Sequence, residues 1–213
     1  MIVIRLEDVQ AALALDHFNV WAAQRRMAPR HRRLRRRADR PGQPRQAGVL
    51  VLLYPAEEGL AFALIRRTSN PHDVHSGQIS LPGGAREGDE TPIETALRET
   101  REELGVQGLV QIIGSLTCLY ITPSDFEVRP AVGYVNKRPV WVPDQAEVVE
   151  VIECPLGWLL DDARKVVEDW DRNGEIMQVP WYDVHGHKVW GATAIILSEF
   201  EHRLRVVMDG RSG

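Results

Sequence analysis

Acidic side chains are concentrated between residues 84 and 106, directly after a glycine-rich turn. Glu99, Glu102 and Glu103 are spaced i, i+3, i+4, so on a helix their carboxylates would be neighbours. Three adjacent carboxylates repel one another unless a cation compensates their charge. Mg²⁺ and Mn²⁺ take oxygen ligands, and Mg²⁺ is commonly held by a few carboxylates together with a substrate phosphate. The spacing therefore indicates a site for a hard divalent cation beside a phosphate.

The sequence marks both ends of the helix that must position these carboxylates. Thr91 and Glu94 form a capping box, with Pro92 in the first helical position. Gly105 stands where a left-handed C-cap is favoured. At about 100° per residue the helix has one stripe that we expect to face the core, away from the glutamates. That stripe consists of Ile93, Leu97, Thr100 and Leu104.

A second interpretation of this helix is a charged, solvent-facing element with no ligand. Glu94 and Arg98 are spaced i, i+4 and would form an ion pair on such a surface. However, residues 81–84 read Leu-Pro-Gly-Gly, a tight turn that brings backbone carbonyls close to the acidic residues. The turn and the carboxylates together favour the metal site.

The segment resembles the Nudix box, G-x5-E-x7-R-E-U-x-E-E-x-G-U, in which U is aliphatic. Every fixed position is matched between Gly84 and Val106, and one aliphatic position departs because Thr100 stands there. On this motif the chain is identified as a member of the Nudix hydrolase superfamily. The resemblance implies a divalent-metal-dependent hydrolase of phosphoanhydride bonds. It also implies an α/β fold, the Nudix α/β/α sandwich with a mixed sheet.

The resemblance implies a metal-binding role for five residues of the box. Glu99 and Glu103 would be the principal ligands of Mg²⁺ or Mn²⁺, with Glu102 in the same cluster. The carbonyl of Gly84 would contribute, and Glu90 would be an outer ligand.

The resemblance also implies a catalytic set. Arg98 would orient Glu99 through a charge-assisted hydrogen bond. The general base is open between Glu99 and a carboxylate outside the box. Glu147 matches a common Nudix position for the second option and is our choice, although a solvated loop acid is the alternative interpretation. The catalytic candidates are therefore Glu99, Arg98, Glu102 and Glu147.

Residues upstream of the box resemble the coenzyme A pyrophosphatase branch of the family. His75, Gly77, Gln78 and the Pro-Gly-Gly turn match its signature, whereas Leu81 replaces the usual phenylalanine. This branch implies hydrolysis of coenzyme A or its thioesters to 3′,5′-ADP and (acyl-)4′-phosphopantetheine. Arg66 and Arg67 on the preceding strand, or the arginines of residues 32–37, are the candidates to bind the adenosine 3′-phosphate. The substrate-binding candidates are Arg66, Arg67, His75, Gln78 and Gly83.

Two other functions remain open. One changes only the substrate, to an ADP-sugar, a dinucleoside polyphosphate or a nucleoside triphosphate. The other is a non-catalytic Nudix module that senses a nucleotide or binds RNA. Such modules usually lose carboxylates of the box, and none is lost here.

The hydrophobic pattern predicts mixed strands and helices, which favours a sheet covered by helices on both faces. We expect a helix over residues 6–28, a short helix after Pro155 and a closing helix over residues 192–202. Strands are expected over residues 47–53, 60–66, 110–119, 128–135 and 148–152, with a hairpin formed by residues 179–182 and 188–190. The expected organisation is an N-terminal helical extension and basic connector (1–44), a Nudix hydrolase domain (45–205) and a tail (206–213).

Composition narrows the class of protein further. With 44% hydrophobic residues and no apolar run long enough to span a bilayer, we expect a cytoplasmic protein that does not enter membranes. Residues 25–45 hold ten arginines and one acid, but no interleaved aromatics that would stack bases, which argues against nucleic acid as a partner. This basic block is either a solvated connector or a functional segment, and the functional roles left open are a phosphate-binding rim, subunit contacts and nonspecific RNA affinity. The expected partner is a small nucleotide-containing substrate, and the N-terminal extension is compatible with a homodimer. Cys118 and Cys154 are expected to be buried structural thiols.

Overall fold

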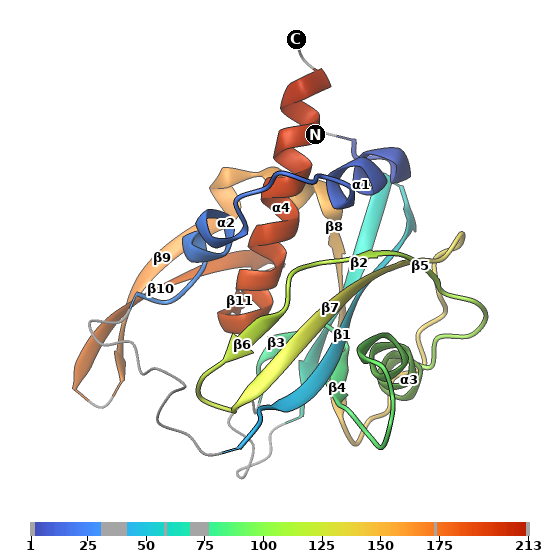
Figure 1. Cartoon of the computed structure of the whole chain (residues 1–213), viewed down its shortest axis with the longest axis horizontal. Helices are drawn as coiled ribbons and strands as arrows, with labels where there is room; N and C mark the ends of the chain where they lie inside the picture. Colours follow the sequence, from blue (N-terminus) through green and yellow to red (C-terminus); the bar gives the residue numbers. More distant parts are fainter. Residues whose placement is uncertain (1–2, 31–41, 58, 69–76, 173, 212–213) are drawn as a thin grey trace.

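The computed structural model describes residues 3–30, 42–57, 59–68, 77–172 and 174–211, and within them the chain forms four α-helices and eleven β-strands. Strands β1–β8 form a mixed sheet, and the remaining three form a smaller antiparallel sheet (Figure 1). The helices are α1 (Leu6–Leu13), α2 (Val20–Arg26), α3 (Pro92–Leu104) and α4 (Gly191–Arg211).

The large sheet is built around β1 (Arg45–Ala56). This strand runs parallel to β7 (Phe126–Tyr134) and antiparallel to β2 (Gly59–Arg67). The other strands pair with these three: β4 (Gly83–Ala85) with β1, β3 (Ile79–Ser80) and β8 (Val148–Pro155) with β2, and β5 (Gln111–Ser115) and β6 (Leu119–Ile121) with β7.

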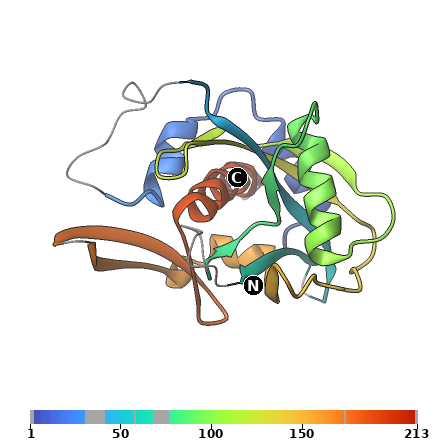
Figure 2. The ribbon, with the colours of Figure 1, turned by 90° about the horizontal axis from the view of Figure 1, so that it is seen from below.

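Both faces of the large sheet are covered by helices. Side chains of β1 alternate between the two faces, as in any strand. Leu50, Leu52 and Tyr54 belong to the core under α3, whereas Val51 and Leu53 belong to the core under α4. Figure 2 shows α3 and α4 on opposite sides of β1. Burial on both faces explains the continuous apolar run of β1, and the expected α/β/α sandwich with a mixed sheet is confirmed.

The helix α3 begins and ends where its capping signals predicted. Thr91 accepts the backbone N–H of Glu94, the Glu94 carboxylate accepts the N–H of Thr91 at 2.7 Å, and Gly105 adopts a left-handed conformation with φ of 65°. The Glu94 carboxylate caps the helix, so the Glu94–Arg98 pair of the alternative interpretation is not formed. Arg98 contacts other carboxylates.

The predicted core stripe of α3 was wrong at its N-terminal end. Ile93 is 37% exposed, whereas Ala96, Thr100 and Leu104 are buried. The helix is rotated so that its buried face also includes Glu103, which is 1% exposed. Thr100 is tolerated at an aliphatic position of the box because its hydroxyl donates to the carbonyl of Ala96 at 2.6 Å.

The N-terminal region forms two helices in place of the single helix that was expected over residues 6–28. Asn19 caps α2 by accepting the backbone N–H of Ala22 at 3.0 Å, and α1 ends at Leu13. Both helices pack against α4, which is longer than predicted. The buried Glu199 of α4 joins these parts by accepting hydrogen bonds from Gln24 of α2, Arg203 and Thr117.

The remaining strand and helix predictions differ from the structure in several places, and the short strands β3 and β4 were not predicted. The strand expected over residues 110–119 is broken into β5 and β6, because the backbone N–H of Thr117 donates to Glu199. The helix after Pro155 is a 3₁₀ helix, Leu156–Leu160. In the second sheet, β10 (Glu175–Val184) and β11 (His187–Trp190) form the expected hairpin, and β9 (Lys165–Arg172) was not predicted.

Two composition-based expectations can be compared with the described residues. Cys154 is buried, as predicted, but Cys118 is exposed because it lies in the connection between β5 and β6. None of the helices in the described ranges has the length and apolar character that crossing a bilayer requires.

The helix α3 packs closely against β1 at Gly48. A Cβ added at this residue would lie 2.0 Å from the carbonyl oxygen of Pro92 and 2.9 Å from the backbone nitrogen of Ala96. Both are backbone atoms of α3, so neither can be moved without displacing the helix. We predict that Gly48→Ala lowers the free energy of unfolding by about 2–4 kcal/mol, measured by denaturant unfolding. Gly210→Ala is the matched control, because nothing lies within 4 Å of its added Cβ, and an equal loss in both variants would contradict the prediction.

Candidate active site

Three carboxylates converge at one side of α3, two from the helix itself and one from a separate loop. Glu99 and Glu103 lie one turn apart on α3, and Glu147 lies in the loop before β8. Each offers an oxygen such that the three atoms lie within 4.8 Å of one another. Glu103 is buried and Glu147 is exposed, so the group extends from the protein interior to its surface.

Glu103 is the buried member of this group, and two contacts hold its carboxylate in place. Its Oε2 accepts the backbone N–H of Gly83 at 2.8 Å, and its Oε1 lies 3.4 Å from Nη1 of Arg67. Burial raises the pKa of the Glu103 carboxyl to about 8, although the Gly83 hydrogen bond and the Arg67 charge oppose that rise. A buried carboxylate with a raised pKa gains most from a nearby cation.

Glu99 lies against the glycine turn that precedes the box. A Cβ added at Gly84 would lie 2.4–2.6 Å from the carboxylate atoms of Glu99, so a larger residue there would displace this carboxylate from its present position. Burial raises the pKa of Glu99, and the hydrogen bond from Arg98 at 3.0 Å opposes this rise. The turn therefore places backbone beside a desolvated carboxylate, as the sequence predicted.

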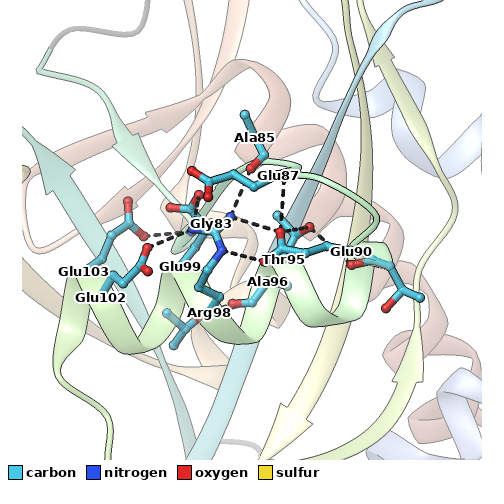
Figure 3. Close-up of polar contacts among 12 residues, drawn as sticks. Gly83, Ala85, Glu87, Glu90, Thr95, Ala96, Arg98, Glu99, Glu102 and Glu103 are labelled. Carbon is cyan, nitrogen blue, oxygen red and sulfur yellow. Dashed lines mark hydrogen bonds and ion pairs between the residues drawn. The ribbon is translucent and has the colours of Figure 1, made fainter.

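Arg98 connects three acidic residues of the box, Glu90, Glu99 and Glu102 (Figure 3). Its guanidinium donates to Glu90 at 2.7 and 3.1 Å, to Glu99 at 3.0 Å and to Glu102 at 2.8 Å. It also donates to the carbonyl of Ala85 at 3.2 Å, which ties α3 to the turn. The hydrogen bond from Arg98 lowers the pKa of Glu90 to about 2, and the same bond raises the pKa of Arg98.

The structure separates the five metal-ligand candidates into two groups. Glu99 and Glu103 lie in the three-carboxylate group, with Gly84 against Glu99. Glu102 is 57% exposed and paired with Arg98, and it lies outside that group. Glu90 is held by Arg98 and by the buried hydroxyl of Thr95 at 3.0 Å. Both outlying carboxylates thus contact the arginine that holds Glu99.

The loop that carries Glu147 is attached to the end of β2. The backbone N–H of Thr68 donates to the carbonyl of Glu147 at 2.8 Å, and the Thr68 hydroxyl donates to the carbonyl of Ala146 at 3.0 Å. Sequence reasoning missed Thr68 and Thr95. Thr95 is close to Glu90 in the sequence, so helical spacing offered a signal for it, whereas Thr68 is 78 residues from its partner and offered none.

The substrate-binding candidates are divided between this site and its surroundings. Arg67 faces Glu103, and its backbone N–H donates to the carbonyl of Gln78 at 3.1 Å. Gly83 donates to Glu103. Arg66 pairs with Glu150 at 3.1 Å, and both side chains are about two-fifths exposed. His75 lies outside the described residues.

The donor set fits a hard divalent cation. All three converging side chains offer carboxylate oxygen, the ligand type that Mg²⁺ and Mn²⁺ prefer over nitrogen or sulfur. Two of the three are largely desolvated, with side-chain exposures of 14% for Glu99 and 1% for Glu103. Holding them together without a cation is unfavourable because like charges repel strongly where water is excluded.

Comparison with known proteins assigns the family. A family model described as the NUDIX domain matches residues 44–187. This chain belongs to the Nudix family. The match includes every residue of the three-carboxylate group, so the Nudix motif and the converging geometry describe the same site.

Several named Nudix hydrolases resemble this chain. It is 36% identical over 175 residues to the uncharacterized Nudix hydrolase NudL of Pectobacterium atrosepticum, covering 79% of this chain and 85% of that protein. It is 34% identical over 167 residues to the human mitochondrial coenzyme A diphosphatase NUDT8, covering 76% and 70%. It is 32% identical over 163 residues to Nudix hydrolase 22, chloroplastic, of Arabidopsis thaliana, covering 73% of this chain. The chain spans 54% of that plant protein's length.

Proposed function

We propose that this chain hydrolyses a phosphoanhydride bond with the help of Mg²⁺ or Mn²⁺. The observation that carries the proposal is the convergence of Glu99, Glu103 and Glu147 to within 4.8 Å, with one of the three buried. All fixed acidic positions of the Nudix box are also present. Non-catalytic Nudix modules usually lose carboxylates of the box, so the intact set favours a hydrolase.

A phosphoanhydride is kinetically inert because its anionic oxygens repel a nucleophile. When bound, a divalent cation supplies charge neutralisation at those oxygens and a lower pKa for a coordinated water. In this proposal Glu99 and Glu103 are the principal ligands, and the carbonyl of Gly84 contributes. Arg98 fixes the Glu99 carboxylate, and it also holds Glu90 and Glu102 in an outer layer.

We assign the remaining steps of the hydrolysis to individual residues of the site. Glu147, at the exposed side of the group, accepts the proton of the attacking water as general base; Glu99 is the alternative base. The water oxygen forms a bond to one phosphorus, the bridging oxygen leaves with the other phosphate, and the proton stays on the base until it reaches solvent. The Gly83 N–H keeps Glu103 oriented while this happens.

Coenzyme A or a coenzyme A thioester is the substrate we favour. The products would be 3′,5′-ADP and (acyl-)4′-phosphopantetheine. Support comes from the upstream residues Gly77, Gln78 and Pro82-Gly83-Gly84, and from the 34% identity to a protein named a coenzyme A diphosphatase. Arg66, exposed at the end of β2 near this turn, is the candidate contact for the 3′-phosphate.

A substrate panel with product identification by mass tests this proposal. Coenzyme A, dephospho-coenzyme A, ADP-ribose and diadenosine polyphosphates would be compared in Mg²⁺ and in Mn²⁺. We expect the highest kcat/KM for coenzyme A, and we expect Arg66→Met to raise KM more for coenzyme A than for dephospho-coenzyme A. If an ADP-sugar or a dinucleotide is hydrolysed faster than coenzyme A, the preferred substrate is another nucleoside diphosphate derivative. No turnover of any compound would contradict the hydrolase proposal.

A further inference from the structure

Two arginines contact the three-carboxylate group from different elements. Arg98, on α3, contacts Glu99 and three other acceptors, so it acts as a clamp. Arg67, at the end of β2, directs Nη1 to Oε1 of Glu103 at 3.4 Å. The other carboxylate oxygen of Glu103 accepts the Gly83 N–H. Arg67 therefore occupies the side of Glu103 that its backbone hydrogen bond leaves open.

The position of Arg67 is restricted by its strand. Its backbone N–H donates to Gln78, its neighbour Thr68 holds the Glu147 loop, and its side chain is 30% exposed. These contacts fix the backbone of Arg67 beside the site, and its guanidinium lies against the Glu103 carboxylate. Because Glu103 is 1% exposed, water screens little of the interaction between its carboxylate and any neighbouring charge.

We propose that Arg67 competes with the divalent cation for Glu103 and thereby weakens metal binding. A positive charge beside a ligand carboxylate repels a cation that approaches the same carboxylate. This inference rests on the proposed metal role of Glu103. It assigns Arg67 a role at the metal-binding carboxylates, in place of the 3′-phosphate contact expected from the sequence.

Direct measurement of Mn²⁺ binding tests the inference without turnover. Free Mn²⁺ would be followed by electron paramagnetic resonance during titration of the full-length chain. We expect Arg67→Met to lower the Kd for Mn²⁺ roughly tenfold, because the repelling charge is removed from a poorly screened position. Arg67→Lys keeps a positive charge and should stay within about threefold of the wild type.

Arg66→Met is the matched control, because it removes the same charge from the adjacent residue. Arg66 is 42% exposed and pairs with Glu150, so solvent screens its charge and we expect a change in Kd below about twofold. Melting temperatures in chelator would establish that each variant is folded, and Arg67→Gln replaces Arg67→Met if the latter does not fold.

The outcomes separate this inference from the proposed function. Unchanged or weaker Mn²⁺ binding by Arg67→Met, with normal binding by the wild type, overturns the competition and leaves the hydrolase proposal standing. If Arg66→Met lowered the Kd for Mn²⁺ by the same factor, the effect would come from net charge alone. That result would also overturn the proposed competition by Arg67. Absence of Mn²⁺ binding by the wild type contradicts both proposals.

Discussion

Glu103→Gln and Glu99→Gln are each expected to lower kcat by about 10³-fold for a diphosphate substrate. Each substitution removes a negative charge from the two desolvated carboxylates of the site but keeps the size of the side chain. The glutamine oxygen at position 103 can still accept the Gly83 N–H, so we expect the melting temperature to change little. Steady-state kinetics at saturating Mn²⁺, beside thermal unfolding in chelator, measure both quantities.

Glu102→Gln is the matched control for this prediction. Glu102 is the next residue along α3, but it is 57% exposed and lies outside the three-carboxylate group. Its substitution removes only the charge of one acceptor of Arg98 and is expected to reduce kcat by less than about tenfold. A loss of kcat as large as that of Glu103→Gln would show that the convergence of Glu99, Glu103 and Glu147 does not identify the carboxylates that catalysis requires.

Arg98→Met is expected to reduce kcat by about 10²-fold, the second largest effect. The substitution leaves Glu90, Glu99 and Glu102 without the guanidinium that holds all three, so Glu99 loses its orientation. Arg98→Lys should recover little of the activity, because a single ammonium cannot reproduce donation to several carboxylates and a carbonyl. Kinetics and Mn²⁺ titration together would distinguish lost orientation from lost folding.

Arg101→Met tests whether the effect is specific to the position of Arg98. Arg101 is on the same helix and carries the same charge, but its side chain is exposed to solvent. We expect this variant to keep near-normal kcat. Comparable losses in the two variants would mean that net charge on α3, and not the contacts of Arg98, supports activity.

Local signals predicted the parts of the site that depend on neighbours in the sequence. The capping box at Thr91 and the left-handed Gly105 set the limits of α3, because both act within one helical turn. The spacing of Glu99 and Glu103 placed their carboxylates together for the same reason. The close contact between Gly84 and Glu99 agrees with the choice of glycine in the preceding turn.

Features that depend on distant contacts were harder to predict. The rotation that buries Glu103 and exposes Ile93 follows from the packing of α3 on β1 at Gly48, which no helical periodicity encodes. Arg67 faces Glu103 because β2 lies beside the glycine turn, and a strand pattern alone does not say which neighbour an arginine will meet. Glu147 matched a family position, but its attachment through Thr68 depends on the folded sheet.

Exposed and edge elements were also difficult to predict from pattern. β9 has three acidic residues among its eight and pairs only with β10 within the described residues, so it lacked the apolar run that identified β1. The strand expected through residue 119 ends early because Thr117 bonds to the buried Glu199 of α4. That break places Cys118 at the surface, although its sequence surroundings resemble those of a buried strand.

Anomalous diffraction from a crystal soaked in Mn²⁺ with a non-hydrolysable diphosphate analogue tests the central claim most directly. We expect a manganese peak next to the carboxylates of Glu99 and Glu103, with the diphosphate analogue bound beside it. A fully soaked crystal with no manganese at these two residues, or with the diphosphate bound elsewhere, would contradict the account.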